Sequence, residues 1–191
     1  MGGTESCISP YIGAPDSGRI SPIRRLVSKL PPRPQFEELV AAFFAERNWQ
    51  FGVPERWFHS ACQKMWDHLN MRCLPGCRRT GECPACKEDI NPHWLSFCFS
   101  VLAIGSSCLQ TPRNGGRYLM YSITAMRFVG DILLVTPAYS TSEGTVHGGV
   151  LSCYASVLLA MYLVDRGRVS EAWKLIGTCV CARAAPALAL H

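Results

Sequence analysis

Apolar side chains recur along most of the chain at intervals of three and four residues. This spacing places side chains on one face of an α-helix and therefore predicts amphipathic helices. The first apolar stripe consists of Phe36, Leu39, Val40, Phe43 and Phe44. A second helix is predicted after Pro54, because proline suits the first turn of a helix. Its stripe consists of Phe58, Cys62, Met65, Trp66 and Leu69.

Two later segments, residues 90–110 and 146–164, are apolar on almost every side. Between them, residues 118–136 predict a helix that Pro137 ends. A sixth helix is expected after the polar turn at 165–168. Its apolar stripe consists of Val169, Trp173, Ile176 and Val180. Six predicted helices and no convincing strand indicate an all-α fold of stacked antiparallel helix pairs.

The helical period is absent from two parts of the chain. Residues 1–35 are rich in Gly, Ser, Pro and Arg, so we expect a largely disordered linker there, followed by a helical domain over residues 36–191. The period is lost again at residues 70–90, where we expect a cysteine-rich loop. A chain of 191 residues is long enough to bury one ordinary core.

Composition favours two classes of protein. Apolar residues make up 48% of the chain and charged residues only 17%, against about 25% charged in typical soluble domains. A deeply packed helical fragment of something larger fits these values, and so does a small multi-pass membrane protein, because about 20 apolar residues cross a bilayer. The two long apolar runs contain His, Ser and Gly and lack flanking aromatic and basic belts. We therefore favour the packed helical fragment, with the membrane protein as the alternative.

The charge distribution bears on nucleic-acid binding, and the cysteines bear on the cellular compartment. The formal net charge is +5, but basic residues gather only near the start, at Arg19, Arg24, Arg25, Lys29 and Arg33. A nucleic-acid reader normally gathers its basic residues on one folded face, so we interpret this group as a solvated linker. The chain has 11 cysteines, an odd number, and opens without a signal-peptide pattern. Those in apolar runs, Cys98, Cys108, Cys153, Cys179 and Cys181, are expected to be buried thiols in a reducing compartment.

The stretch from Cys73 to Cys86 is the one candidate metal site. Its spacing, C-x3-C-x5-C-x2-C, comes from Cys73, Cys77, Cys83 and Cys86. Zinc prefers four thiolates in tetrahedral geometry, but ribbon-type sites separate their two pairs by 12 residues or more. These four cysteines could therefore hold a single zinc at most. The simpler interpretation is a loop stiffened by Pro75 and Pro84.

Catalytic patterns are poor. His147–Gly149 has the glycine-flanked form of esterase oxyanion loops, but no G-x-S-x-G elbow accompanies it. The chain contains neither a phosphate-binding loop nor a dinucleotide fingerprint. We therefore expect a protein that is not an enzyme.

Five sequence blocks in order resemble the fungal-specific transcription factor domain, the helical middle region of fungal zinc-cluster transcription factors. The blocks are YIGAPDSGRI, LPPRPQFEELVAAFF, WQFGVPERWFH, INPHWLSFCFSVLAIGSSC and SEAWKLIG. The similar region covers about residues 10–180. Trp57, Trp94, Trp173 and Gly177 are the motif residues, and we expect the three tryptophans to be core residues rather than ligand contacts.

The resemblance implies a regulator of DNA-templated transcription in a fungal nucleus. It implies other transcription factor subunits or co-regulators as partners, with no membrane contact. In the family, an upstream six-cysteine cluster binds zinc and reads DNA, whereas Cys73–Cys86 lies inside the similar region with a different spacing. Zinc and DNA binding are therefore expected only in a domain missing from this chain, and no cofactor is expected here.

The end of the chain also departs from the family pattern. The family continues beyond the A-W-x-x-x-G block into further helices, whereas this chain reads GTCVCARAAPALALH and stops. We therefore expect a fold truncated at the C-terminus, with apolar faces left uncovered.

Overall fold

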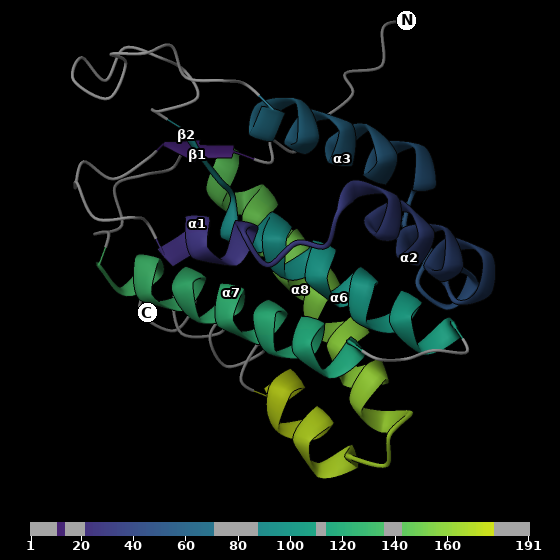
Figure 1. Cartoon of the computed structure of the whole chain (residues 1–191). Helices are drawn as coiled ribbons and strands as arrows, with labels where there is room; N and C mark the ends of the chain where they lie inside the picture. Colours follow the sequence, from purple (N-terminus) through teal and green to yellow (C-terminus); the bar gives the residue numbers. More distant parts are fainter. Residues whose placement is uncertain (1–10, 14–21, 71–87, 110–113, 136–142, 178–191) are drawn as a thin grey trace, which may run out of the picture.

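The computed structural model describes residues 11–13, 22–70, 88–109, 114–135 and 143–177. Its fold class is all-α, as predicted. Figure 1 shows the helices α1 (Pro22–Val27), α2 (Arg33–Glu46), α3 (Glu55–Asn70), α6 (Pro92–Cys108), α7 (Gly115–Val135) and α8 (Glu143–Val164). A short 3-10 helix, η1 (Asn48–Gln50), follows α2, and a further helical segment spans 169–177.

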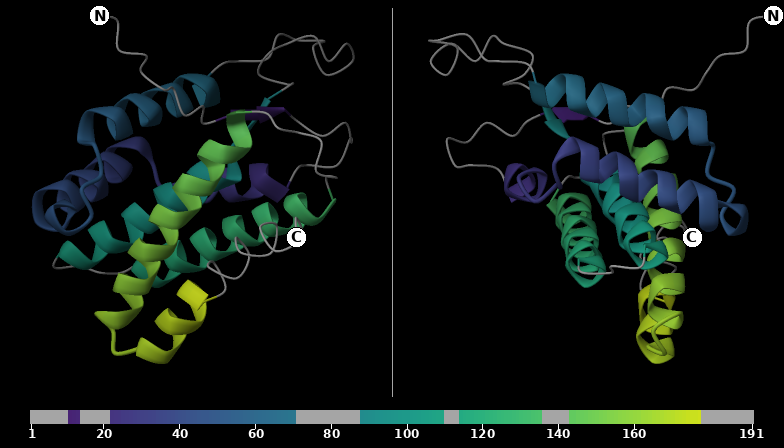
Figure 2. Two further views of the ribbon diagram at one scale, coloured as in Figure 1. Left: turned by 180° about the vertical axis from the view of Figure 1, so that it is seen from behind. Right: turned by 45° about the vertical axis from the view of Figure 1, so that its right-hand side comes forward.

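Helix α6 forms the centre of the molecule. It packs against α7, α8 and α2, which surround it in the two views of Figure 2. Every residue of α6 is buried except His93, Ser107 and Cys108. A helix that is apolar on every side requires such a position, because each of its faces must be covered. The long apolar run predicted at residues 90–110 is thus the central helix of the core.

Helix α3 joins this stack through aromatic side chains. Phe58 is completely buried, and its ring centroid lies 5.3 Å from that of Trp94 and 5.5 Å from that of Phe97 on α6. On the side of α2, the rings of Phe36 and Trp66 meet edge to face at 5.4 Å. Aromatic pairs in this distance range stabilise packing beyond their buried area. Aromatic side chains of α3 therefore contribute to its packing against both α2 and α6.

One glycine allows α2 and α6 to approach each other closely. A Cβ atom added at Gly105 of α6 would lie 2.0 Å from the backbone oxygen of Leu39 on α2. Any side chain at this position would force the two backbones apart. Gly105 therefore fixes how closely α2 packs on the central helix.

Three buried serines form a hydrogen-bonded cluster between α6 and α7. The hydroxyl of Ser122 lies 3.0 Å from that of Ser96 and 2.9 Å from that of Ser100. The Ser96 backbone carbonyl accepts from the Ser122 hydroxyl at 2.7 Å and from the Ser100 hydroxyl at 2.8 Å. Buried hydroxyl groups are tolerated when they are hydrogen-bonded, and each of these has a partner.

The predicted linker requires a correction. Within residues 1–35, Tyr11–Gly13 form strand β1, which pairs antiparallel with β2 (Glu88–Ile90), and α1 contributes buried Ile23 and Leu26 to the core. Helix α2 begins at Arg33 rather than at Phe36. Proline occupies the N-cap and the first turn of α2, where no intrahelical N–H bond is lost. The prolines of this stretch therefore start a helix rather than exclude one.

The membrane-protein alternative requires helices that can cross a bilayer. Among the described helices, none combines the length and the apolar character that are needed to cross a membrane.

Candidate functional site

The structure places the predicted motif residues in different environments. Trp94 is buried on α6, and Trp57 on α3 is half-buried, with its ring edge-to-face to Trp94 at a centroid distance of 5.7 Å. Both are core residues, as expected. Gly177 has open space around it, since a Cβ atom there would meet nothing within 4 Å. These residues do not converge on one site.

The expectation that Trp173 belongs to the core is wrong, because its side chain is 69% exposed. In the segment 169–177, Ala172 is the buried residue, whereas Val169, Trp173 and Ile176 are exposed. A turn with Gly167 at φ +73° precedes the segment and sets its direction. Helical period predicts an apolar face, but it does not predict which neighbour covers that face.

The cysteines separate into buried and exposed thiols. Cys98 is buried on α6, and its burial, followed by the hydrogen bond that its thiol donates to Cys62 on α3, raises the pKa of the Cys98 thiol well above the ordinary value. Cys153 on α8 is exposed, which corrects the expectation that it is buried. Among the described residues, no group of three or more potential ligands could hold a metal ion. Cys73, Cys77, Cys83 and Cys86 lie outside those residues, so single-zinc binding there stays a prediction.

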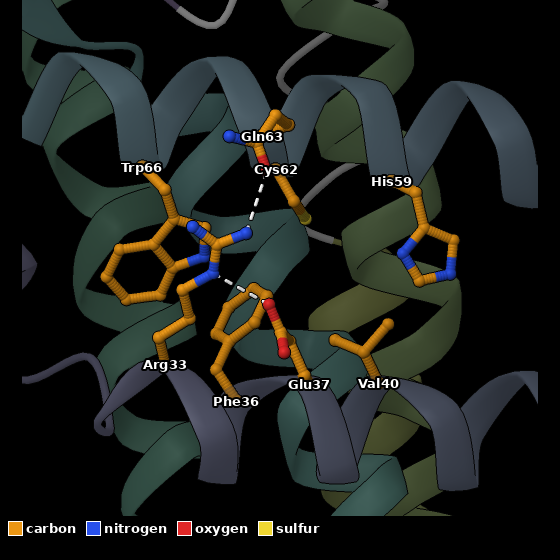
Figure 3. Close-up of a pocket in the computed structure, with 8 residues that line it drawn as sticks. All are labelled: Arg33, Phe36, Glu37, Val40, His59, Cys62, Gln63 and Trp66. Atoms are coloured by element: carbon orange, nitrogen blue, oxygen red, sulfur yellow. Dashed lines mark hydrogen bonds and ion pairs between the residues drawn. The ribbon is translucent and has the colours of Figure 1, made fainter.

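A small cavity lies between α2 and α3. Figure 3 shows its lining side chains, Arg33, Phe36, Glu37, Val40, His59, Cys62, Gln63 and Trp66. Its polar groups are largely bonded to one another. Arg33 Nε donates to Glu37 Oε1 at 2.7 Å, and its other arm donates to Gln63 Oε1 at 2.8 Å.

The size of this cavity limits what it can bind. Its volume is about 150 Å³, whereas pockets for drug-sized molecules have about 300–1,000 Å³. The Arg33 guanidinium already has two partners, so an anionic ligand would have to displace at least one of them. We therefore interpret the cavity as a packing gap between two helices.

A histidine of α6 and a serine of α8 lie close together. His93 Nδ1 lies 2.5 Å from Ser152 Oγ on α8, and the His93 backbone N–H donates to Asn91 Oδ1 at 2.9 Å. A nucleophilic serine also needs hydrogen-bond donors for the oxyanion. Ser152 lies inside α8, where the neighbouring backbone N–H groups are used by the helix. We therefore interpret the pair as a packing contact between the start of α6 and α8.

Within the described part of the chain, one face of α8 carries exposed apolar side chains. Val150, Val157 and Val164 are 43%, 50% and 42% exposed, and Cys153 is exposed between the first two. We call these four residues the α8 apolar face. In the left view of Figure 2, α8 runs across the molecule with no other described helix in front of it. The face extends for about 21 Å, since each helical residue rises about 1.5 Å.

A hollow opens at one end of this face. We call it the Phe51 hollow, and its lining residues are Gln50, Phe51, Val150, Cys153, Tyr154 and Val157. Its volume is about 300 Å³. Trp49, in η1 next to the hollow in sequence, is 79% exposed. Sequence reasoning missed Trp49, although a tryptophan between polar Asn48 and Gln50 outside any helical stripe was a usable signal.

Comparisons with known proteins give no assignment. No protein-family model matches the chain, and no curated protein or solved structure matches it at a significant level.

Proposed function

We propose that this chain is a regulatory module that works through protein contacts rather than catalysis, comparable to the middle domain of fungal zinc-cluster transcription factors. The α8 apolar face, together with Trp49, is the observation that carries the proposal. Exposed apolar side chains gathered on one helix face are typical of interaction sites. The five sequence blocks and the all-α fold are consistent with this proposal.

The proposed partners are other transcription factor subunits or co-regulators in a fungal nucleus. Contact with DNA would come through a separate domain. From Gly144 to Val164, α8 contains no Asp, Glu, Lys or Arg. A phosphate backbone is recognised chiefly by Lys and Arg, so this helix suits an apolar protein surface much better than a nucleic acid.

A reporter assay tests the proposal. The full chain is fused to an unrelated DNA-binding domain, and expression of a reporter gene with the matching site is measured in a fungal cell. We expect the fusion to change expression several-fold and the Val157→Asp substitution to abolish the change, because a carboxylate on the α8 apolar face opposes burial against a partner.

The matched control is Met120→Asp on α7. Met120 is 55% exposed, close to the exposure of Val157, but it lies outside the α8 apolar face. This variant should regulate like the unchanged chain. A fusion without effect on the reporter, or equal loss in both variants, would contradict the proposal.

A further inference from the structure

The Trp49 side chain projects from the surface. Its only polar atom, Nε1, donates to the Glu46 carbonyl at 3.1 Å. The turn behind it is braced by Asn48, whose side chain donates to the Val53 carbonyl at 3.0 Å and accepts from the Val53 N–H at 2.9 Å. The exposed part of the indole is therefore apolar, and little conformational freedom of this turn remains to be lost on binding.

The Phe51 hollow can receive such a projection. Val150, Val157 and Tyr154 line it from α8, and Phe51 lines it from the segment after η1. At about 300 Å³ it is at the lower limit for drug-sized molecules, so a single large side chain is a suitable occupant. Buried tryptophans in well-packed pockets are the commonest energetic anchors of protein interfaces.

The projection and the hollow adjoin on one molecule, because Gln50 and Phe51 directly follow Trp49 in the chain. A two-fold symmetric pair requires a self-complementary patch in which each copy donates and receives the same contact. The uncharged stretch of α8 also favours self-pairing. Although the chain has a net charge of +5, two copies meeting along α8 would bring no like charges together there.

We propose that two copies of this chain pair across a two-fold axis, with Trp49 of each copy inserted into the Phe51 hollow of the other. This inference rests on the proposed function, in which the α8 apolar face is a protein contact surface. It names a second copy of the chain as the occupant of that face.

Sedimentation velocity of the full chain over a series of concentrations, with a reducing agent present, tests the pairing. We expect a monomer–dimer equilibrium. Trp49→Ala removes the projection and Val157→Asp places a charge at the hollow, so both variants should be monomeric at concentrations where the unchanged chain is dimeric. Met120→Asp should dimerise normally. Circular dichroism and thermal unfolding verify that each variant is folded.

Chemical crosslinking tests the geometry itself. A Gln50→Cys variant keeps Trp49 and places a thiol next to it, because Gln50 is exposed and lines the hollow. With Trp49 of one copy in the hollow of the other, position 50 of one copy would lie near Cys153 of the other, and a short bismaleimide would join them by adding to both thiols. Mixing isotope-labelled and unlabelled copies before mass spectrometry separates links between molecules from links within one molecule. A mixed-label link between position 50 and Cys153 supports the proposal, whereas its absence overturns it.

The remaining outcomes separate this inference from the proposed function. A chain that stays monomeric at all concentrations, or a dimer unaffected by Trp49→Ala, overturns the pairing. If Val157→Asp still abolishes regulation in that case, the face binds a different protein and the proposed function stands. If pairing depends on Trp49 but the reporter never responds, the pairing stands and the regulatory function fails.

Discussion

Helices α6 and α8 have nearly the same kind of sequence but opposite positions in the molecule. Neither carries an Asp, Lys or Arg, and both are apolar on almost every side. Yet α6 is covered all round, whereas α8 leaves three valines between 42% and 50% exposed. Apolar composition therefore identifies helices that require cover, but only the packing shows which of them receive it. The incompletely covered helix is the better candidate for binding.

The largest expected effect comes from disturbing the packing of α2 on α6 at Gly105. The Gly105→Ala substitution places a Cβ atom 2.0 Å from the Leu39 carbonyl oxygen. Because the two backbones must separate, we expect the free energy of unfolding to fall by about 3 kcal/mol or more, measured by urea denaturation.

Gly116→Ala on α7 is the matched control for this substitution. A Cβ atom there meets nothing within 4 Å. The change should be neutral or should stabilise by up to about 1 kcal/mol, because alanine favours helix more than glycine does. Equal losses in the two variants would contradict the close approach of α2 and α6.

A pair of valine truncations compares the two helices directly. Val101 on α6 is completely buried and Val157 on α8 is 50% exposed. Val101→Ala should lower the free energy of unfolding by about 2–3 kcal/mol, since it loses buried methyl groups and leaves a cavity. Val157→Ala should change it by no more than about 0.5 kcal/mol. Denaturant unfolding of dilute protein measures both, and similar values would mean that α8 is covered in solution.

The last prediction is a pH dependence that comes from Cys98 on α6. Burial holds its pKa well above the ordinary value, so above about pH 8.5 the unfolded thiol loses its proton while the folded one keeps it. Stability from this group is complete below that pH and falls as the pH rises further, by at most about 1.4 kcal/mol per pH unit.

Unfolding of the unchanged chain and of Cys98→Ala, followed from neutral to alkaline pH, measures this contribution. The variant should lose stability less steeply between about pH 8.5 and pH 10. Above that range the raised pKa values of buried Tyr118 and Tyr162 act in the same direction. Identical slopes for the two proteins below pH 10 would exclude a protected thiol at Cys98.

Much of the fold was accessible from the sequence because six helices have a long apolar period. The six predicted helices correspond to α2, α3, α6, α7, α8 and the segment at 169–177 in the structure. Helix α1 was missed because its six residues bury only Ile23 and Leu26, which is too short a pattern to count as a period. The stacking of antiparallel pairs and the extent of the domains stay predictions.

The candidate surface was harder to predict for a physical reason. Trp173 and Trp49 are both exposed, but the first lies in a helical stripe that suggested burial and the second lies in a short turn outside any helical stripe. Exposure depends on contacts between segments that are distant in the chain. Local periodicity contains no information about these contacts, so Cys153 was also assigned incorrectly.

The serine cluster has a consequence for how uniquely this molecule folds. Contacts between apolar side chains are non-directional, so α7 could slide along α6 by one turn, about 5.4 Å, and still bury similar area. Such a slip would separate Ser122 from Ser96 and Ser100 and leave the buried hydroxyl groups of Ser122 and Ser96 without these partners, whereas Ser100 would keep its bond to the Ser96 carbonyl of its own helix. Since each unpaired hydroxyl costs about 1–3 kcal/mol, the cluster selects a single register between the two helices.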